Sequence, residues 1–146
     1  MLFYSLMEKI PLGTISGSNH LFDLYYSTAA DVIGLIQISH GMAEHKGRYI
    51  DFINFFNAYG YHVVIYDHRG HGNRIIDEKI GFFDNVNGWE LVVMDLITVH
   101  EETNNLFPKI PKILLGHSMG SWIGLAAMQK KSSFDAALIS GSSYPN

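Results

Sequence analysis

A five-residue segment, Gly116-His117-Ser118-Met119-Gly120, carries the residue types that nucleophilic catalysis by serine requires. A serine hydroxyl is a weak nucleophile unless it is held clear of the backbone and beside a base. A sharp turn between a strand and a helix exposes Ser118 in this way, and glycines flank it because side chains there would clash. The N–H of Met119 can then face the negative oxygen that forms when an acyl carbonyl is attacked. The segment predicts a serine nucleophile with one donor for that oxygen.

The residues on either side of this segment have the pattern that such a turn needs. Residues 113–115 form a short apolar run after Pro111, which is typical of a buried parallel strand. Residues 122–128 are largely apolar and precede Lys130 and Lys131, and cations suit the C-terminus of a helix. Strand, turn and helix together are the context in which Gly-x-Ser-x-Gly carries chemistry.

The preceding chain alternates between further strands and helices. Residues 8–18 and 20–27 predict an antiparallel hairpin with its turn at residues 16–19. Residues 32–39 are almost continuously apolar and β-branched, which is typical of a strand buried on both faces. Two more strands are predicted, at residues 61–66 and 134–140.

Two helices are expected between these strands, separated by a turn-rich loop at residues 67–72 and an irregular stretch. Residues 48–59 place apolar side chains at three- and four-residue spacing, and Gly60 can end that helix. Asn87 can cap the next helix, with Glu90 completing a capping box. One face of this helix is expected in the core: Trp89, Val92, Val93, Leu96 and Val99. The order predicts an α/β fold with a mostly parallel sheet and helices on both faces.

Composition narrows the function classes. The chain has 146 residues, 47% of them hydrophobic, which suffices for one globular domain with a real core. A net charge of −4 without a basic cluster argues against nucleic-acid binding. The absence of cysteine excludes disulfides and thiol catalysis. The N-terminus lacks the basic start of a secretory signal, and the longest uncharged run is too short for a membrane span, so we expect a soluble, cytoplasmic protein.

Four segments resemble, in order and spacing, the successive motifs of one branch of the α/β-hydrolase superfamily. This branch contains monoglyceride lipases and lysophospholipases and is of serine aminopeptidase S33 type. They are HGMAEHKGRY, YDHRGHG, GFFDNVNGWELVVMDL and LLGHSMGS, and the resemblance runs over residues 36–141. It implies an α/β-hydrolase fold with an antiparallel N-terminal hairpin, and hydrolysis of acyl esters without cofactor or metal. It also implies roles for individual residues: Ser118 as nucleophile, the backbone N–H groups of Met42 and Met119 as oxyanion hole, His40 and Gly41 as shapers of the oxyanion loop, and Gly116, His117 and Gly120 as parts of the elbow.

The same resemblance implies a catalytic acid and histidine that follow later strands, and the sequence does not contain them. It runs to Asn146, just beyond the sixth of the usual eight strands, and the lid segment of such enzymes is also missing. We therefore expect residues 1–146 to be the N-terminal part of a single α/β-hydrolase domain, truncated after the sixth strand. The last strand then leaves an open edge for self-association or for a C-terminal partner chain.

No histidine in the sequence offers itself as the missing base. Those in the loops at the active edge are expected to shape these loops, and His117 is expected to pack because neighbours on a sharp turn project in different directions. The remaining ones are expected at ordinary surface or strand positions. The histidines of these loops are His40, His45, His68 and His71. Those expected at surface or strand positions are His20, His62 and His100.

Other motifs are incomplete. His40 with Glu44 and His45 resembles an inverted zinc-protease pattern, but that pattern needs histidine where Gly41 stands. A dinucleotide fingerprint at residues 70–75 lacks its third glycine. Four acids do not have a spacing that selects a glycosidase pair, and Asp67 with Arg69 is expected to order its own loop. These acids are Glu44, Asp67, Asp84 and Asp95.

Two functional hypotheses remain open. In the first, the chain is a serine esterase that acts on a small acyl ester or lipid, such as a monoacylglycerol or lysophospholipid, through an acyl-enzyme at Ser118; it then meets membranes only peripherally, through its substrate. In the second, it is a catalytically inactive truncated hydrolase or a pseudoenzyme that binds a ligand. A third possibility, intermediate between these two, is that the chain is half of a split enzyme that a separate C-terminal chain completes. Since loss of the histidine costs on the order of 10⁶ in kcat in a comparable triad, the chain alone is expected to be nearly inactive.

Overall fold

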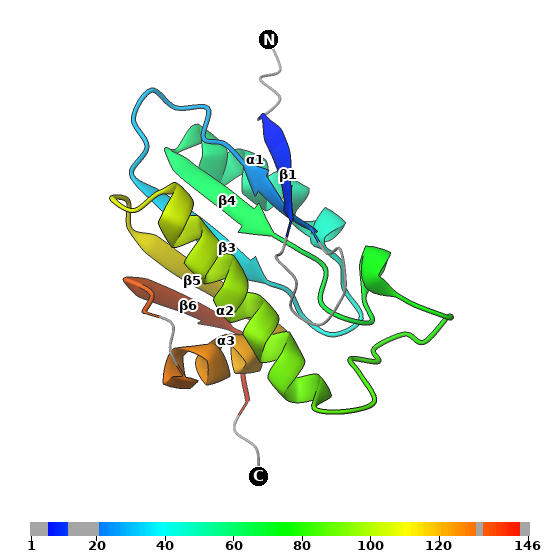
Figure 1. Cartoon of the computed structure of the whole chain (residues 1–146). Helices are drawn as coiled ribbons and strands as arrows, with labels where there is room; N and C mark the ends of the chain where they lie inside the picture. The colour runs from blue at the N-terminus through cyan, green and yellow to red at the C-terminus, as the bar shows by residue number, and fades with distance from the viewer. Residues whose placement is uncertain (1–5, 12–20, 131–132, 144–146) are drawn as a thin grey trace.

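One mixed sheet with helices on both faces makes up the fold (Figure 1). The computed structural model describes residues 6–11, 21–130 and 133–143. In these residues the strand order is β1-β2-β4-β3-β5-β6, antiparallel between β1, β2 and β4 and parallel from β4 to β6. The strands are β1 (Met7–Pro11), β2 (Leu21–Tyr25), β3 (Gly34–Ser39), β4 (Tyr61–Ile65), β5 (Lys112–His117) and β6 (Ala136–Ser140).

The central strand β3 shows how the two faces are covered. Leu35 packs in a cluster with Val99, whereas Ile36 and Ile38 pack with Ile53. Successive strand residues face opposite sides of a sheet, so the helices that carry Val99 and Ile53 lie on opposite faces. The prediction of a strand buried on both faces is confirmed, because all of β3 is buried. The helices are η1 (Lys46–Tyr49), α1 (Ile50–Ala58), η2 (Gly72–Arg74), α2 (Gly88–Leu106) and α3 (Met119–Lys130).

The carboxyl ends of β3, β4 and β5 lie level with one another. Ile38 is paired with Ile65 of β4, and Ser39 is paired with Gly116 of β5. The loops that follow these strands therefore leave the sheet at the same edge, where sites in parallel α/β sheets are found. This edge brings residues 40–47, residues 67–72 and the turn at Ser118 together.

Some details of the helices differ from the prediction. The first helix opens with a 3₁₀ turn, η1, before α1 begins. The capping box at Asn87 is wrong, because Asn87 has φ = +56° and its side chain makes no capping hydrogen bond. A capping side chain needs extended backbone at that position. Trp89 is also not in the core: it is 40% exposed, in the first turn of α2, which extends beyond the strand ends (Figure 1).

The last strand, β6, is exposed on both faces along its whole length. It stands at the end of the sheet, and Leu138 and Ile139 are 52% and 39% exposed. The N-terminal hairpin is confirmed by the antiparallel pairing of β1 with β2, while its turn lies outside the described residues. Among the described residues, no helix has both the length and the apolar character needed to span a membrane.

Candidate active site

Ser118 stands at the junction of β5 and α3 in a backbone conformation that non-glycine residues rarely adopt, with φ = +50°. Its N–H donates to the carbonyl of Ser140 at 2.8 Å. Its carbonyl accepts hydrogen bonds from the N–H and the hydroxyl of Ser121, at 2.9 and 2.5 Å. Because both polar groups of its backbone are bonded, the surrounding structure holds Ser118 in this strained conformation.

The two glycines of the turn are fixed by close backbone contacts. A methyl carbon added to Gly116 would lie 2.8 Å from Cα of Ser121. One added to Gly120 would collide with the carbonyl of Ser39, at the end of β3. Glycine at these positions lets α3 approach both β5 and β3, and so brings Ser118 up to the loop that follows β3.

That loop, residues 40–47, faces Ser118 through Gly41. A methyl carbon added to Gly41 would lie 3.3 Å from Cβ of Ser118. The carbonyl of Gly41 is 2.8 Å from Nδ1 of His40. A trans peptide points its N–H away from its C=O, so this bond fixes the direction of the N–H of Met42 in the same peptide group. No described residue forms a hydrogen bond with the backbone N–H of Met42 or Met119.

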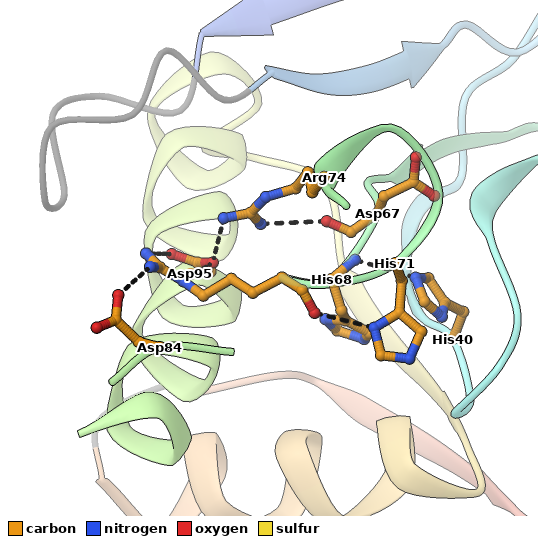
Figure 2. Close-up of polar contacts among 8 residues, drawn as sticks. His40, Asp67, His68, His71, Arg74, Asp84 and Asp95 are labelled. Carbon is orange, nitrogen blue, oxygen red and sulfur yellow. Dashed lines mark hydrogen bonds and ion pairs between the residues drawn. The ribbon is translucent and has the colours of Figure 1, made fainter. Parts of the chain in front are cut away.

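The ring of His40 links this loop to the loop after β4. Its Nε2 lies 3.0 Å from the backbone nitrogen of His68, which can only donate. Nε2 is therefore an acceptor, and Nδ1 carries the proton that is donated to the carbonyl of Gly41. His68 in turn places Nε2 3.1 Å from the hydroxyl of Ser39. The neutral tautomer of His40 is thus required by its two neighbours. Its ring meets that of His71 edge-on, with the ring centroids 5.4 Å apart (Figure 2).

Asp67 organises the loop after β4. One carboxylate oxygen accepts the N–H of Lys46 at 2.8 Å, and the other accepts the N–H of Asn73 at 2.9 Å. Gly72 has φ = +50° and lies directly against this carboxylate, so a side chain there would collide with it. Asp67 therefore joins the loops after β3 and β4, in agreement with the ordering role expected from sequence.

A buried ion-pair network anchors the same loop to α2. Arg69 donates from Nε and Nη2 to both carboxylate oxygens of Asp95, at 2.9 and 3.0 Å. Arg74 places Nη2 2.9 Å from the same carboxylate and donates from Nη1 to the carbonyl of Asp67 (Figure 2). Asp84 is more distant, at 3.7 Å from Arg69. Two guanidinium groups thus share one buried carboxylate.

A model of a known protein family matches most of the chain. Residues 30–144 match the family model described as serine aminopeptidase, S33. The chain belongs to this family. The match covers β3 to β6, and with them the strand, turn and helix around Ser118. The family resemblance expected from the four sequence motifs is therefore confirmed.

Several relatives of this S33 family member are lipases. The chain is 31% identical to monoglyceride lipase of Rattus norvegicus over 90% of its own length and 42% of that protein. It is 33% identical to monoacylglycerol lipase of Mycolicibacterium smegmatis, over 87% and 44% of the two chains. It is 31% identical to the probable lysophospholipase L2 of Haemophilus influenzae, over 80% and 37%. The chain thus spans about two fifths of the length of these curated relatives.

Solved structures confirm the α/β-hydrolase fold. A thermostable carboxyl esterase from Bacillus coagulans superimposes with a TM-score of 0.81 at 24% identity, covering 93% of this chain and 44% of that one. A lipase in its open form gives a TM-score of 0.79 at 25% identity, with 92% and 44% covered. These two structures are named as an esterase and a lipase, and the likeness shows that this chain has their fold over the superimposed part.

The histidines other than His40, His68 and His71 differ in their exposure and in their bonding partners. His117 is partly exposed, with Nδ1 3.3 Å from the hydroxyl of Ser140, and Nδ1 of the exposed His45 accepts the N–H of Gly47. His62 lies on β4, as expected, and its Nδ1 accepts the N–H of Ser27. His100 is not at a surface or strand position, because it lies on α2 and is only 2% exposed. Its ring packs at a tilt against that of Phe134, with the ring centroids 4.0 Å apart. His20 lies outside the described residues.

The sequence-based prediction did not include the contacts that three residues make at this edge. Arg74 and Asp95 complete the ion-pair network, and Glu44 bonds the N–H of Gly41 at 2.7 Å. Of these, only Glu44 had a readable signal, because a carboxylate three residues after a turn glycine can accept its N–H. The partners of Arg74 and Asp95 come from separate elements, which no local pattern reveals.

Acidification is expected to lower the stability of the chain between pH 7 and pH 5. Burial lowers the pKa of His40 and lowers that of His68 well below its usual value; the neighbouring rings of His40 and His71 add to the effect at His68. At His40, burial outweighs the attraction of the Asp67 and Glu44 carboxylates. Both rings are therefore neutral in the fold, whereas the unfolded chain binds protons below about pH 6.5.

The contribution of these neutral rings is fully present above pH 6.5 and is lost as pH falls towards their folded-state pKa values. We expect the thermal midpoint, followed by circular dichroism at constant ionic strength, to fall by roughly 4 °C for each 1 kcal/mol lost. The exposed His45 provides a control, because His45→Gln should leave this dependence as it is. An equal midpoint at pH 7 and pH 5 would contradict the neutral His40–His68 pair.

Proposed function

We propose that this chain provides the nucleophile of a carboxylic ester hydrolase and forms an acyl-enzyme at Ser118. The observation that carries the proposal is the conformation of Ser118, at φ = +50° between β5 and the first turn of α3. A strained serine at a strand-to-helix turn is what acyl transfer on this fold uses. We further propose that residues 1–146 are the N-terminal part of a single hydrolase domain.

The oxyanion hole in this proposal consists of the backbone N–H groups of Met42 and Met119. Attack by the hydroxyl of Ser118 on an acyl carbonyl forms a bond from Oγ to carbon and moves a pair of electrons onto the carbonyl oxygen. Met119 begins α3, whose N-terminus favours negative charge. Met42 supplies the second donor from the loop that His40 orients through Gly41. The proton of the Ser118 hydroxyl passes through solvent water to the ester oxygen of the leaving group. Collapse of the intermediate then breaks the bond between the carbonyl carbon and that oxygen, expels the alcohol and leaves the acyl group on Ser118.

The substrate class proposed is a monoacylglycerol or a lysophospholipid. The support is that relatives carry the names monoglyceride lipase, monoacylglycerol lipase and probable lysophospholipase L2. With a small acyl ester of this kind as substrate, the protein contacts a membrane only when the membrane supplies the lipid. The cytoplasmic location remains a prediction from sequence.

A second candidate is a hydrolase half that needs a partner chain, or one without catalysis. The observation that favours it is that no described residue forms a hydrogen bond with the hydroxyl of Ser118. A nucleophile without a base retains only the contribution of the oxyanion hole and of binding, about 10³–10⁴ over the reaction in water. The exposed strand β6 would be the surface on which a second copy or a partner chain docks.

Turnover of an activated short-chain ester tests the proposed reaction. We expect the wild-type chain to hydrolyse a p-nitrophenyl ester slowly but above the buffer rate, and Ser118→Ala to reduce the rate to that of buffer. The corresponding p-nitroanilide, with its poorer leaving group, serves as a control for ester preference. Equal rates for wild type and Ser118→Ala would contradict acyl transfer through this serine.

A further inference from the structure

Glu44 takes no part in the proposed acyl transfer, yet its carboxylate binds Gly41, the residue through which this loop faces Ser118. Its Oε2 accepts the N–H of Gly41 at 2.7 Å and the hydroxyl of Tyr49 at 3.0 Å. Its Oε1 lies 3.5 Å from a guanidinium nitrogen of Arg48, and the side chain is only 15% exposed. The carboxylate is therefore bound from the turn that precedes it and from η1, which follows it.

The backbone between Gly41 and Glu44 is strained. Ala43 has φ = +58°, a left-handed conformation that residues other than glycine rarely adopt. Such conformations persist only where neighbouring contacts over-determine them. The bond from the N–H of Gly41 to the side chain of Glu44 spans this turn and closes it. Tyr49, from η1, holds the carboxylate in place for that bond.

The turn closed by Glu44 contains the proposed oxyanion donor. A methyl carbon added to Gly41 would lie 2.9 Å from Oε2 of Glu44 and 3.3 Å from Cβ of Ser118, so the carboxylate and the nucleophile flank the same glycine. Glu44 binds the N–H of Gly41, and His40 binds its carbonyl. With both peptide groups of Gly41 tethered, the N–H of Met42 has one direction available to it.

We propose that Glu44 is a positioning residue, whose carboxylate locks the turn at residues 41–44 and thereby aims the N–H of Met42 at the space in front of Ser118. The inference rests on the proposed function, because it concerns a donor for the oxyanion of that reaction. Glu44 acts through the backbone and does not itself touch the reacting atoms. A locked donor is worth more than a mobile one, since no reorganisation is needed when the charge forms.

The ionised form of Glu44 is the one that this role requires. Burial by itself would raise the pKa of Glu44, but the hydrogen bonds from Gly41 and Tyr49, with the nearby His117 and Arg48, outweigh burial and lower it. The carboxylate therefore stays charged at neutral pH, and charge-assisted bonds of this kind are shorter and stronger than neutral ones.

The kinetics of Ser118 modification by a fluorophosphonate test the positioning role. We expect Glu44→Ala to lower the maximal rate of inactivation by roughly 100-fold, the order found for loss of one oxyanion donor, with the half-saturating probe concentration unchanged within about twofold. Glu44→Gln keeps an acceptor oxygen and should recover much of the rate, to roughly 10-fold below wild type. Glu90→Gln, an exposed carboxylate in the first turn of α2, is the matched control and should behave as wild type.

An NMR measurement of the Gly41 amide separates this inference from the proposed function. In the chain of residues 1–146, we expect a downfield, slowly exchanging Gly41 amide. Glu44→Ala should turn it into an upfield, fast-exchanging one, and Glu44→Gln should largely restore the wild-type signal. An unchanged Gly41 amide or an unchanged inactivation rate in Glu44→Ala would overturn the positioning role. A wild-type chain that the probe does not modify at Ser118 would count against the proposed function, and the amide measurement would then decide alone whether Glu44 locks the turn.

Discussion

Gly120→Ala is expected to lower the free energy of unfolding by about 3 kcal/mol or more and to abolish modification of Ser118 by serine-directed probes. The added carbon would collide with the carbonyl of Ser39, which belongs to the backbone of β3 and cannot turn away. Either α3 moves away from β3 or the end of β3 shifts, and both changes separate Ser118 from Gly41. Urea unfolding followed by tryptophan fluorescence measures the loss.

Gly124→Ala is the matched control, since it makes the same change in the same helix. There the added carbon would lie 2.6 Å from Cδ2 of Leu114, the end of a side chain that can shift. Replacing a helical glycine by alanine also gains up to about 1 kcal/mol in helix propensity. We expect Gly124→Ala to lie within about 1.5 kcal/mol of wild type. Equal stability of the Gly120 and Gly124 variants would show that α3 does not approach β3 as described.

Asp95→Asn is expected to lower the free energy of unfolding by about 3–5 kcal/mol, although it preserves the shape of the side chain. Asp95 is 3% exposed, and its carboxylate faces the guanidinium groups of both Arg69 and Arg74. Removing its charge leaves two buried cations without the carboxylate that they share. The loop at residues 67–74, which Arg69 and Arg74 tie to α2, should loosen with it.

Asp84→Asn controls for the loss of one carboxylate near the same arginine. The side chain of Asp84 is 40% exposed and lies 3.7 Å from Arg69, so its pair is screened by water. Exposed pairs of this kind contribute about 0–1 kcal/mol. Urea unfolding of both variants at equal ionic strength measures the difference. A loss in Asp84→Asn as large as that in Asp95→Asn would contradict the assignment of Asp95 as the centre of the network.

Local patterns were sufficient to predict the architecture, because most elements carry their own signal. The apolar run at residues 32–39 and the spacing of residues 48–59 reflect burial on two faces and on one face, and β3 and α1 follow them closely. Where the prediction was wrong, the cause lay in tertiary position. Asn87 has the residue type of a cap but a left-handed backbone, and Trp89 has the periodicity of the core but is 40% exposed in the first turn of α2.

The site was predictable only where its residues are neighbours in sequence. The strained turn at Ser118 follows from the flanking glycines, and the structure has the turn at that position. The hydrogen bond between His40 and His68 joins two loops, and these residues are 28 positions apart in sequence. The ion pairs of Asp95 join α2 to the loop after β4. Such contacts depend on how the strand ends meet, which periodicity does not encode.

Site-mapped labelling of the purified chain with a fluorophosphonate tests the central claim, that Ser118 is a poised nucleophile, most directly. Tryptic peptides analysed by mass spectrometry assign the modified residue, and Ser118→Ala is compared with Ser121→Ala, which removes the hydroxyl bonded to the carbonyl of Ser118. We expect the probe to modify Ser118 alone, Ser118→Ala to abolish modification, and Ser121→Ala only to slow it. A chain that stays unmodified, or that is modified at several serines with Ser118 not favoured among them, would show that Ser118 is not a poised nucleophile.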